Sequence, residues 1–212
     1  MRNKIVLASC DQKYYDLYGA TFEQSLRNIN QPYHIHRCEE CPWDEVKKGS
    51  KIGVDKVWYA CSRYLILPEL IEEHGGVFVS DIDAVFIKPI PFPNTKIGIV
   101  KTSPKLHRSE WEQRGQHVLA GFFYCSDVDI ASKIRDRILE LPKIWFVDQI
   151  AIHEVIKDEI DRTYFSKPAS RIRNVKSGDF AIVPRGAGKD SDAFKKLINR
   201  VIQNQQFDYT DT

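Results

Sequence analysis

Residues 63–91 read RYLILPELIEEHGGVFVSDIDAVFIKPIP and carry the clearest structural signal in the chain. The first half is a helical pattern, which we expect Pro68 to restart because proline cannot continue a helix. Gly75 and Gly76 then predict the end of the helix, since glycine favours the left-handed conformation at that position. The apolar run Val77–Val79 follows immediately and predicts a buried strand. A helix that leads directly into a buried strand is typical of α/β proteins.

The same alternation of short apolar runs and helical patterns continues on both sides of this segment. Toward the N-terminus, residues 4–9 and 33–37 predict strands, and Asp11 is placed to cap the helix between them. The other predicted elements are strands at residues 97–100 and 119–124, and helices at residues 56–73, 130–141, 148–157 and 192–203. We therefore predict an α/β fold in which helices flank a mixed, mostly parallel central sheet.

The length and composition restrict the class of protein. A chain of 212 residues suits a single domain spanning residues 1–212. The formal net charge of +2 is too small to indicate a nucleic-acid partner, and no apolar run approaches the roughly 18–20 residues of a membrane-spanning helix. Of the five cysteines, only Cys38 and Cys41 have the spacing of a metal or redox pair, so we expect reduced thiols in a cytoplasmic protein.

Two acidic residues, Asp81 and Asp83, follow the predicted strand. Along an extended backbone, residues two apart point to the same side and lie about 6.6 Å from each other, at roughly 3.3 Å per residue. Two such carboxylates can share one Mg²⁺ or Mn²⁺ ion whose other ligands are diphosphate oxygens and water. The carboxyl ends of strands are also where α/β folds bind ligands. The pair therefore predicts a metal-assisted nucleotide site.

The same spacing occurs twice more, at Asp127 with Asp129 and at Asp190 with Asp192. Each of those pairs precedes a helical pattern, where aspartate caps the helix and interacts favourably with its dipole. Only the pair that follows residues 77–79 lies between two apolar runs, where burying carboxylates is costly unless a cation neutralises them. We therefore assign the metal role to that pair alone.

The whole segment resembles the DxD region of GT-A-fold glycosyltransferases, especially families 8 and 32. In that pattern an arginine-bearing helix, a Gly-Gly stop and an apolar strand precede the DxD motif. The residues that match it here are Arg63, Gly75, Gly76, Asp81 and Asp83. The segment IVLASCDQKYYDLYGATFEQSLRN near the N-terminus is similar to the opening of family 8. The resemblance covers most of the chain, and its DxD block is the most specific part.

This resemblance implies a hexosyltransferase that uses a nucleotide sugar, most simply a UDP-sugar, as donor and Mn²⁺ or Mg²⁺ as cofactor. The acceptor would be a saccharide or another hydroxyl compound. The implied metal ligands are Asp81 and Asp83. The implied donor-binding residues are Ala8, Ser9, Asp11, Tyr14, Arg63, Asp81, Ile82, Gly121 and Gln149, with Asp148 beside the donor sugar.

Residues 166–212 predict a basic loop followed by a closing helix. The loop contains six basic residues and one acid, an excess that suits a phosphate-bearing partner. Within it, Arg185 and Lys189 surround Gly186 and Gly188, and glycines allow backbone amides to approach an anion closely. We expect the two basic residues and Gly188 to bind the diphosphate of the donor.

In the resembling transferases, a histidine in this loop completes the metal site. Here the matching place reads PRG, so either the metal has only the two aspartates, phosphate and water as ligands, or Arg185 supplies part of the positive charge. Departure of the diphosphate builds up negative charge, which cationic side chains stabilise. The expected catalytic residues are Lys189 at the leaving group, Arg63 in support of the DxD strand, and Asp148 at the donor sugar.

Two other interpretations stay open at the level of sequence. The stretch Asp81–Val85 is similar to the DxDx[TV] motif of haloacid dehalogenase-type phosphohydrolases, in which Asp81 would be the nucleophile. That motif normally opens the fold, however, whereas 80 residues precede it here. The second alternative is a non-catalytic module that holds a nucleotide or a sugar, since the loop histidine is missing and Ile150 stands where family 8 usually carries an acid.

Overall fold

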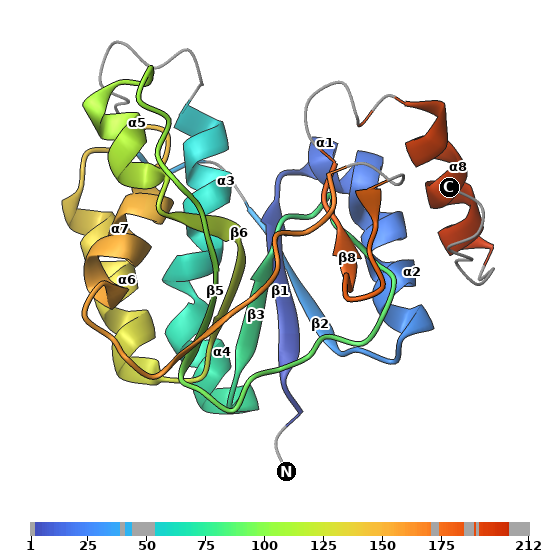
Figure 1. The fold of residues 1–212 in the computed structure, drawn as a ribbon, viewed down its shortest axis with the longest axis horizontal. Helices are drawn as coiled ribbons and strands as arrows, with labels where there is room; N and C mark the ends of the chain where they lie inside the picture. Colours follow the sequence, from blue (N-terminus) through green and yellow to red (C-terminus); the bar gives the residue numbers. More distant parts are fainter. Residues whose placement is uncertain are drawn as a thin grey trace.

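The computed structural model describes residues 3–38, 41–43, 54–170, 174–184, 189 and 191–203. In this part of the chain, six strands form one sheet in the order β2-β1-β3-β6-β5-β7 (Figure 1). They are β1 (Ile5–Cys10), β2 (Tyr33–Arg37), β3 (Val77–Ser80), β5 (Ile97–Lys101), β6 (Val118–Cys125) and β7 (Arg162–Tyr164). β1 is parallel to both of its neighbours, and β7 is parallel to β5, whereas β6 runs antiparallel between β3 and β5. The sheet is therefore mixed and mostly parallel, as predicted.

Helices cover both faces of the sheet, which confirms the α/β fold class (Figure 1). One face carries α3 (Val54–Leu65), α4 (Leu67–His74), α6 (Val128–Glu140) and α7 (Val147–Ile156), and the short α5 (Glu110–Gly115) packs on α7. The other face carries α1 (Gln12–Tyr14), the π-helical turn η1 (Tyr15–Gly19) and α2 (Ala20–Asn28), with α8 (Asp192–Ile202) packed on α2. Beside them lies a two-stranded ribbon, in which β4 (Val85–Phe86) pairs antiparallel with β8 (Ala181–Ile182).

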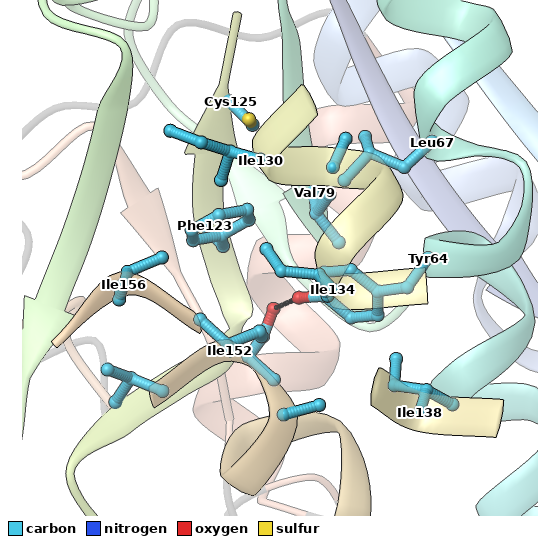
Figure 2. Close-up of a cluster of buried hydrophobic side chains, with 14 of the residues drawn as sticks. Tyr64, Leu67, Val79, Phe123, Cys125, Ile130, Ile134, Ile138, Ile152 and Ile156 are labelled. Carbon is cyan, nitrogen blue, oxygen red and sulfur yellow. Dashed lines mark hydrogen bonds between the residues drawn. The ribbon is translucent and has the colours of Figure 1, made fainter. Parts of the chain in front are cut away.

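Alternation along β3 divides the core into two layers. Val77 and Val79 point toward the face that carries α3, α4, α6 and α7, whereas Phe78 points toward the other face. Figure 2 shows the first layer, in which Tyr64 of α3 and the isoleucines of α6 and α7 gather around the sheet. In the second layer, Phe78 packs edge-on against Phe122 of β6, with ring centroids 4.8 Å apart. Three consecutive apolar residues of the central strand thus anchor both layers.

The transition from helix to strand near residue 75 matches the prediction. Pro68 lies in the first turn of α4, which begins after α3 has ended, and Gly75 ends α4 with a φ of 74°. At the N-terminus, Asp11 caps α1 by accepting a hydrogen bond from the Tyr14 amide at 2.7 Å. These local signals place the DxD motif directly after a buried strand.

The described residues of the two other DxD pairs lie at helix starts, as the sequence indicates, with one difference in detail. Asp127 caps α6 and accepts a hydrogen bond from the Ile130 amide at 3.0 Å. The cap of α8 is Ser191 rather than an aspartate, and Asp192 is the first helical residue. Asp190 lies outside the described residues.

The sequence pattern misses α5, β7 and β8, because elements of a few residues carry little periodicity. A signal for α5 is present nonetheless, since Ser109 and Glu112 form a capping box at its start. Among the residues that the structure describes, no helix combines the length and the apolar character required to cross a membrane.

Candidate active site

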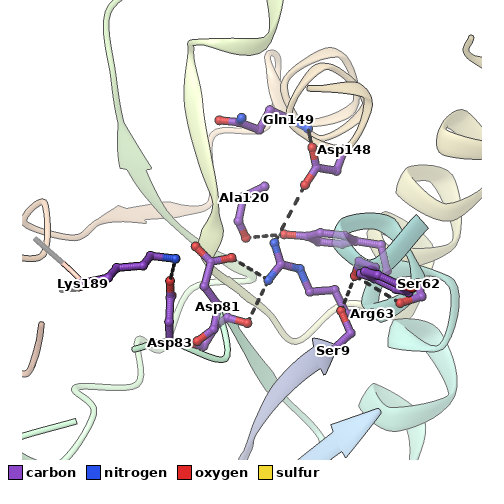
Figure 3. Close-up of polar contacts among 12 residues, drawn as sticks. Ser9, Ser62, Arg63, Asp81, Asp83, Ala120, Asp148, Gln149 and Lys189 are labelled. Carbon is purple, nitrogen blue, oxygen red and sulfur yellow. Dashed lines mark hydrogen bonds and ion pairs between the residues drawn. The ribbon is translucent and has the colours of Figure 1, made fainter. Parts of the chain in front are cut away.

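The DxD motif begins where β3 ends, in the centre of the sheet (Figure 3). The Asp81 amide donates a hydrogen bond to the Gly121 carbonyl of β6 at 3.3 Å. The middle residue of the motif, Ile82, is buried in the second core layer. Of the two carboxylate side chains, that of Asp81 is 41% exposed and that of Asp83 is 8% exposed. The burial of Ile82 and the hydrogen bond from the Asp81 amide hold the backbone that carries both carboxylates.

Arg63 reaches the motif from α3, and only 5% of its side chain is exposed. Its Nη1 donates to Asp81 Oδ1 and to the Ser80 carbonyl, each at 2.8 Å. Its Nη2 lies 3.8 Å from Asp148 Oδ2. Burial lowers the pKa of Arg63, but the neighbouring carboxylates outweigh this effect and raise that pKa above its ordinary value. Arg63 therefore stays charged and holds the Asp81 carboxylate in one position.

Gly121 leaves the space that the Asp81 carboxylate fills. A Cβ atom at this position would lie 2.1 Å from Asp81 Oδ2 and 2.2 Å from its carboxyl carbon. Such separations are far shorter than the contact distance of roughly 3.5–4.0 Å between non-bonded atoms. Position 121 of β6 therefore requires glycine, because the Asp81 carboxylate occupies the space that a side chain would fill.

Lys189 lies in the C-terminal part of the chain and forms an ion pair with Asp83 Oδ2. Its ammonium group also lies 5.9 Å from the ring centre of Tyr14 and 5.4 Å from that of Tyr18. Burial opposes the charged lysine, but Asp83 outweighs it and raises the pKa of Lys189. Burial and the nearby Asp81 raise the pKa of Asp83. Each carboxylate of the motif thus faces its own cationic side chain, as Figure 3 shows.

Asp148 lies in the first turn of α7, on the far side of Arg63 from the DxD motif (Figure 3). Its Oδ1 accepts a hydrogen bond from the Gln149 amide at 2.8 Å. Burial raises the pKa of Asp148 to about 6, although Arg63 opposes this shift. The side-chain nitrogen of Gln149, oriented to satisfy both partners, donates to the carbonyl of Gly115 at 3.1 Å and to that of Val118. The side chains of Asp148 and Gln149 therefore bind other groups of the protein.

Replacing Asp148 by asparagine should stabilise the protein more near pH 7 than near pH 4, relative to the wild type. Burial raises the pKa of Asp148 from 3.8 to about 6, so the folded protein binds this proton more tightly than the unfolded chain does. As the pH rises from 3.8 to about 6, the contribution of Asp148 to the free energy of unfolding therefore falls by on the order of 2–3 kcal/mol. Urea unfolding of both proteins at the two pH values measures the effect, and a stability difference independent of pH would contradict it.

A cavity of about 220 Å³ opens over the DxD motif. The residues predicted from the sequence that line it are Ser9, Tyr14, Arg63, Asp81, Ile82, Asp83 and Lys189. The Ser9 hydroxyl donates to the Tyr59 carbonyl and so ties β1 to α3 along one wall. The cavity lies at the carboxyl ends of the parallel strands β1 and β3, the edge at which α/β proteins bind ligands.

Other predicted site residues do not line this cavity. Ala8 is fully buried within β1, and Asp11 caps α1. Gly121 packs against Asp81, and the contacts of Asp148 and Gln149 are those described above. Two further predicted residues, Arg185 and Gly188, lie outside the described residues.

Several lining residues were not predicted from the sequence. They are Cys10, Lys56, Tyr59, Ala60 and Trp145. Lys56, Tyr59 and Ala60 precede Arg63 at seven, four and three residues, which is the spacing of one helix face, so the sequence did contain a signal for them. Trp145 has no such local signal. Its carbonyl accepts a hydrogen bond from the Trp111 indole nitrogen at 2.8 Å, which fixes the wall that it forms.

The carboxylates of the motif fit a divalent cation. Asp83 Oδ1 is buried and has no hydrogen-bond partner among the described residues, and Arg63 binds only Oδ1 of Asp81. Carboxylate oxygens are the hard ligands that Mg²⁺ and Mn²⁺ prefer. The described part of the chain contains no group of three His, Cys, Asp or Glu side chains that could hold a metal by itself. A cation at this place would therefore complete its coordination with phosphate oxygens and water.

Comparison of the sequence with family models finds no match, and comparison with curated proteins finds none either. Solved structures do match. A glycosyltransferase involved in the glycosylation of the major capsid of PBCV-1 superposes with a TM-score of 0.61 at 11% identity, covering 94% of this chain and 98% of its own. The bifunctional glycosyltransferase WbbM superposes with a TM-score of 0.57 at 14% identity, covering 99% of this chain and 51% of its own. The protein therefore has a fold that is found in glycosyltransferases.

Proposed function

We propose that the protein is a GT-A-type glycosyltransferase that moves a hexosyl group from a nucleoside diphosphate donor, most simply a UDP-sugar, to the hydroxyl group of a saccharide acceptor. The observation that carries this proposal is the convergence of Asp81, Asp83, Arg63 and Lys189 on one cavity at the carboxyl end of the central strand. The fold shared with glycosyltransferases supports the same conclusion. Paired carboxylates with adjacent cations suit a diphosphate better than a neutral ligand.

Transfer of the sugar breaks its anomeric C–O bond, and negative charge accumulates on the departing diphosphate. Lys189 lies in the cavity wall and can stabilise that charge as it develops, which lowers the barrier. Arg63 is a positioning residue, because its guanidinium is buried and acts on the site through Asp81. A bound Mn²⁺ or Mg²⁺ would be held by Asp81 and Asp83 and would add positive charge beside the diphosphate oxygens.

The remaining walls of the cavity suit the other parts of a nucleotide sugar. Tyr14, Tyr59 and Trp145 offer aromatic surface on which a base or a sugar ring can pack. Ser9, at the end of β1, supplies a polar group beside them. Tyr14 also contacts the Lys189 ammonium through its ring, so the aromatic and the cationic parts of the cavity adjoin.

The phosphohydrolase alternative is less well supported by the geometry. In that reading Asp81 would attack phosphorus, yet its Oδ1 is bound by the buried Arg63. The residues after the motif form β4, which pairs with β8, rather than the loop and helix expected after a nucleophilic aspartate. The glycosyltransferase proposal is compatible with the bound Asp81 and with the strand after the motif, because it requires Asp81 only as a fixed ligand and not as a nucleophile.

Replacing Lys189 by glutamine is expected to lower kcat by about 10²-fold, because removal of one group that stabilises transition-state charge typically costs 10²–10³ in rate. The substitution removes the charge, keeps a polar end group and shortens the side chain by one atom. Lys133→Gln, at an exposed position on α6, makes the same change of charge away from the cavity. Steady-state kinetics of both variants with saturating donor test this role. A Lys189→Gln enzyme with the wild-type kcat would contradict it.

The proposed function itself is tested by incubating the protein with a panel of nucleotide sugars and an oligosaccharide mixture in the presence of Mn²⁺. Release of nucleoside diphosphate together with a saccharide product whose mass has increased by one hexose is the expected result. The variant Asp81→Asn/Asp83→Asn should release neither. Hydrolysis of a phosphate monoester that the wild type performs and the double variant does not would favour the phosphohydrolase instead.

A further inference from the structure

A second cavity, of about 280 Å³, lies between the C-terminal half of α7 and the edge of the sheet formed by β5 and β7. Figure 1 shows α7 on the side of the sheet that also carries α5 and α6. No described residue lines both this cavity and the one over the DxD motif. The second cavity is therefore separate from the proposed donor site, and the proposal below does not depend on the proposed function.

The sheet supplies one wall of this cavity through the register of its strands. Ile99 and Lys101 of β5 both line the cavity, although the pairing of β5 with β6 shifts its register between them. Ile99 is paired with Tyr164 of β7, and Lys101 with Val118 of β6. Arg162 is two residues before Tyr164 and shares its face. The strand pairing thus brings two cationic side chains and one phenol ring to the same patch of sheet.

The helix α7 supplies the opposite wall. His153, Ile156 and Lys157 are spaced by three and four residues and therefore lie on one face of the helix. His153 stacks on His117, with ring centroids 4.1 Å apart and an angle of 15° between the planes. Burial lowers the pKa of His153, and so does the neighbouring His117, so the His153 ring favours the neutral form, in which it has one N–H donor.

The charge of the cavity is strongly one-sided. Lys101, Lys157 and Arg162 line it, no carboxylate lines it among the described residues, and none of the three cations forms an ion pair with a described residue. Arg162 does make one hydrogen bond within the protein. Its Nη2 donates to the Lys157 carbonyl at 3.2 Å and so caps the end of α7. Three unpaired cations at one cavity repel each other unless an anion joins them.

Two acidic residues in the neighbouring sequence, Glu154 and Asp161, contact other partners. Glu154 of α7 is bound by Arg114 and Arg137. Asp161 accepts a hydrogen bond from the Lys96 amide at 3.0 Å, at the opposite end of β5 from Lys101. The positive charge of the cavity is therefore not balanced by these acids.

We propose that this cavity binds a small phosphate monoester with a ring, such as a sugar phosphate. The two lysines and Arg162 surround the phosphate group, which carries up to two negative charges and accepts several hydrogen bonds. The ring of the ligand packs between Tyr164, which is 57% exposed, and the apolar floor of Ile99, Val118 and Ile156. A phosphate without a ring would use only the cationic part of this surface, and a neutral sugar would use only the apolar part.

Histidine side-chain NMR tests the location of binding without any mutation. Addition of glucose 6-phosphate is expected to shift the imidazole resonances of His117 and His153, while those of His34 and His36 on β2 stay unchanged. Glucose at the same concentration should leave all four unchanged. Shifts absent from both stacked histidines at saturating glucose 6-phosphate would overturn the proposal.

Matched charge variants then test which cations bind the phosphate. Lys101→Gln/Lys157→Gln should weaken glucose 6-phosphate binding in calorimetry at least tenfold, whereas Lys105→Gln/Lys133→Gln, which removes the same charge from exposed positions elsewhere, should not. Lys189→Gln should retain binding, because its change lies in the other cavity. Equal affinity in both double variants, loss of binding only in Lys189→Gln, or inorganic phosphate binding as tightly as glucose 6-phosphate would each overturn the proposal. Circular dichroism confirms that the variants are folded.

Discussion

Replacing Arg63 by methionine is expected to cost about 3–5 kcal/mol of unfolding free energy and to abolish sugar transfer. The guanidinium of Arg63 is buried, with 5% of the side chain exposed, and it lies between Asp81 and Asp148. Methionine fills much of the same volume but leaves the buried Asp148 without its nearest cation and Asp81 without the group that holds it. Removing one partner of a buried ion pair is costly because the remaining charge is left uncompensated.

Urea unfolding and the transfer assay measure the two effects of Arg63→Met. The matched control is Arg135→Met on α6, whose arginine pairs with Glu69 and Asp136 at the surface and whose loss should cost less than about 1 kcal/mol. Arg63→Lys provides a variant that keeps the charge but cannot make all contacts of the guanidinium, so it should fold and still be impaired in transfer. Wild-type stability and transfer in Arg63→Met would contradict the role given to Arg63.

Replacing Gly121 by alanine is the second change with a large expected effect. The added methyl carbon would lie 2.1 Å from Asp81 Oδ2, so either the carboxylate or β6 must move. Arg63 holds the other oxygen of Asp81, which limits how the carboxylate can rotate away. We expect a fall in kcat/KM of at least about 10²-fold, since small displacements of catalytic groups have effects of that size. The cost in stability should be about 1–3 kcal/mol, as for other overpacked sites.

Gly178→Ala is the matched control for this experiment. A Cβ atom at Gly178 would have no heavy atom within 4 Å, so the same chemical change should leave both stability and activity within the error of measurement. Kinetics and thermal unfolding of the two alanine variants give the comparison. Equal activity of Gly121→Ala and Gly178→Ala would show that the position of the Asp81 carboxylate does not matter for transfer.

Much of the fold is predictable from the sequence because its signals are local. Pro68 and Gly75 mark the boundaries of α4, and Asp11 and Asp127 cap helices where they were expected to do so. Alternation within β3 assigns neighbouring side chains to opposite layers of the core. The short strand β7 was not predicted, because three residues with mixed burial show no periodic pattern.

The candidate site is predictable only in part, because several of its contacts join distant parts of the chain. The spacing of Asp81 and Asp83 after an apolar strand marked the motif, and Arg63 entered with the resemblance. The contact between Gly121 and Asp81 depends on the register of β6 against β3, which no local pattern reveals. The ion pair of Lys189 with Asp83 likewise depends on the path of the C-terminal segment. Such contacts between distant parts of the chain can be identified only from the three-dimensional structure.

The proposed function requires the cations and carboxylates at the end of β3 to bind a nucleoside diphosphate. Thermal unfolding with UDP, with and without Mn²⁺, tests it most directly. UDP at a hundredfold excess over Kd should raise the stability of the wild type by about 2.7 kcal/mol, and this gain should disappear in Asp81→Asn/Asp83→Asn. If neither UDP nor another nucleoside diphosphate stabilises the wild type, or if UDP stabilises the double variant equally, the cavity does not bind the donor in the way described.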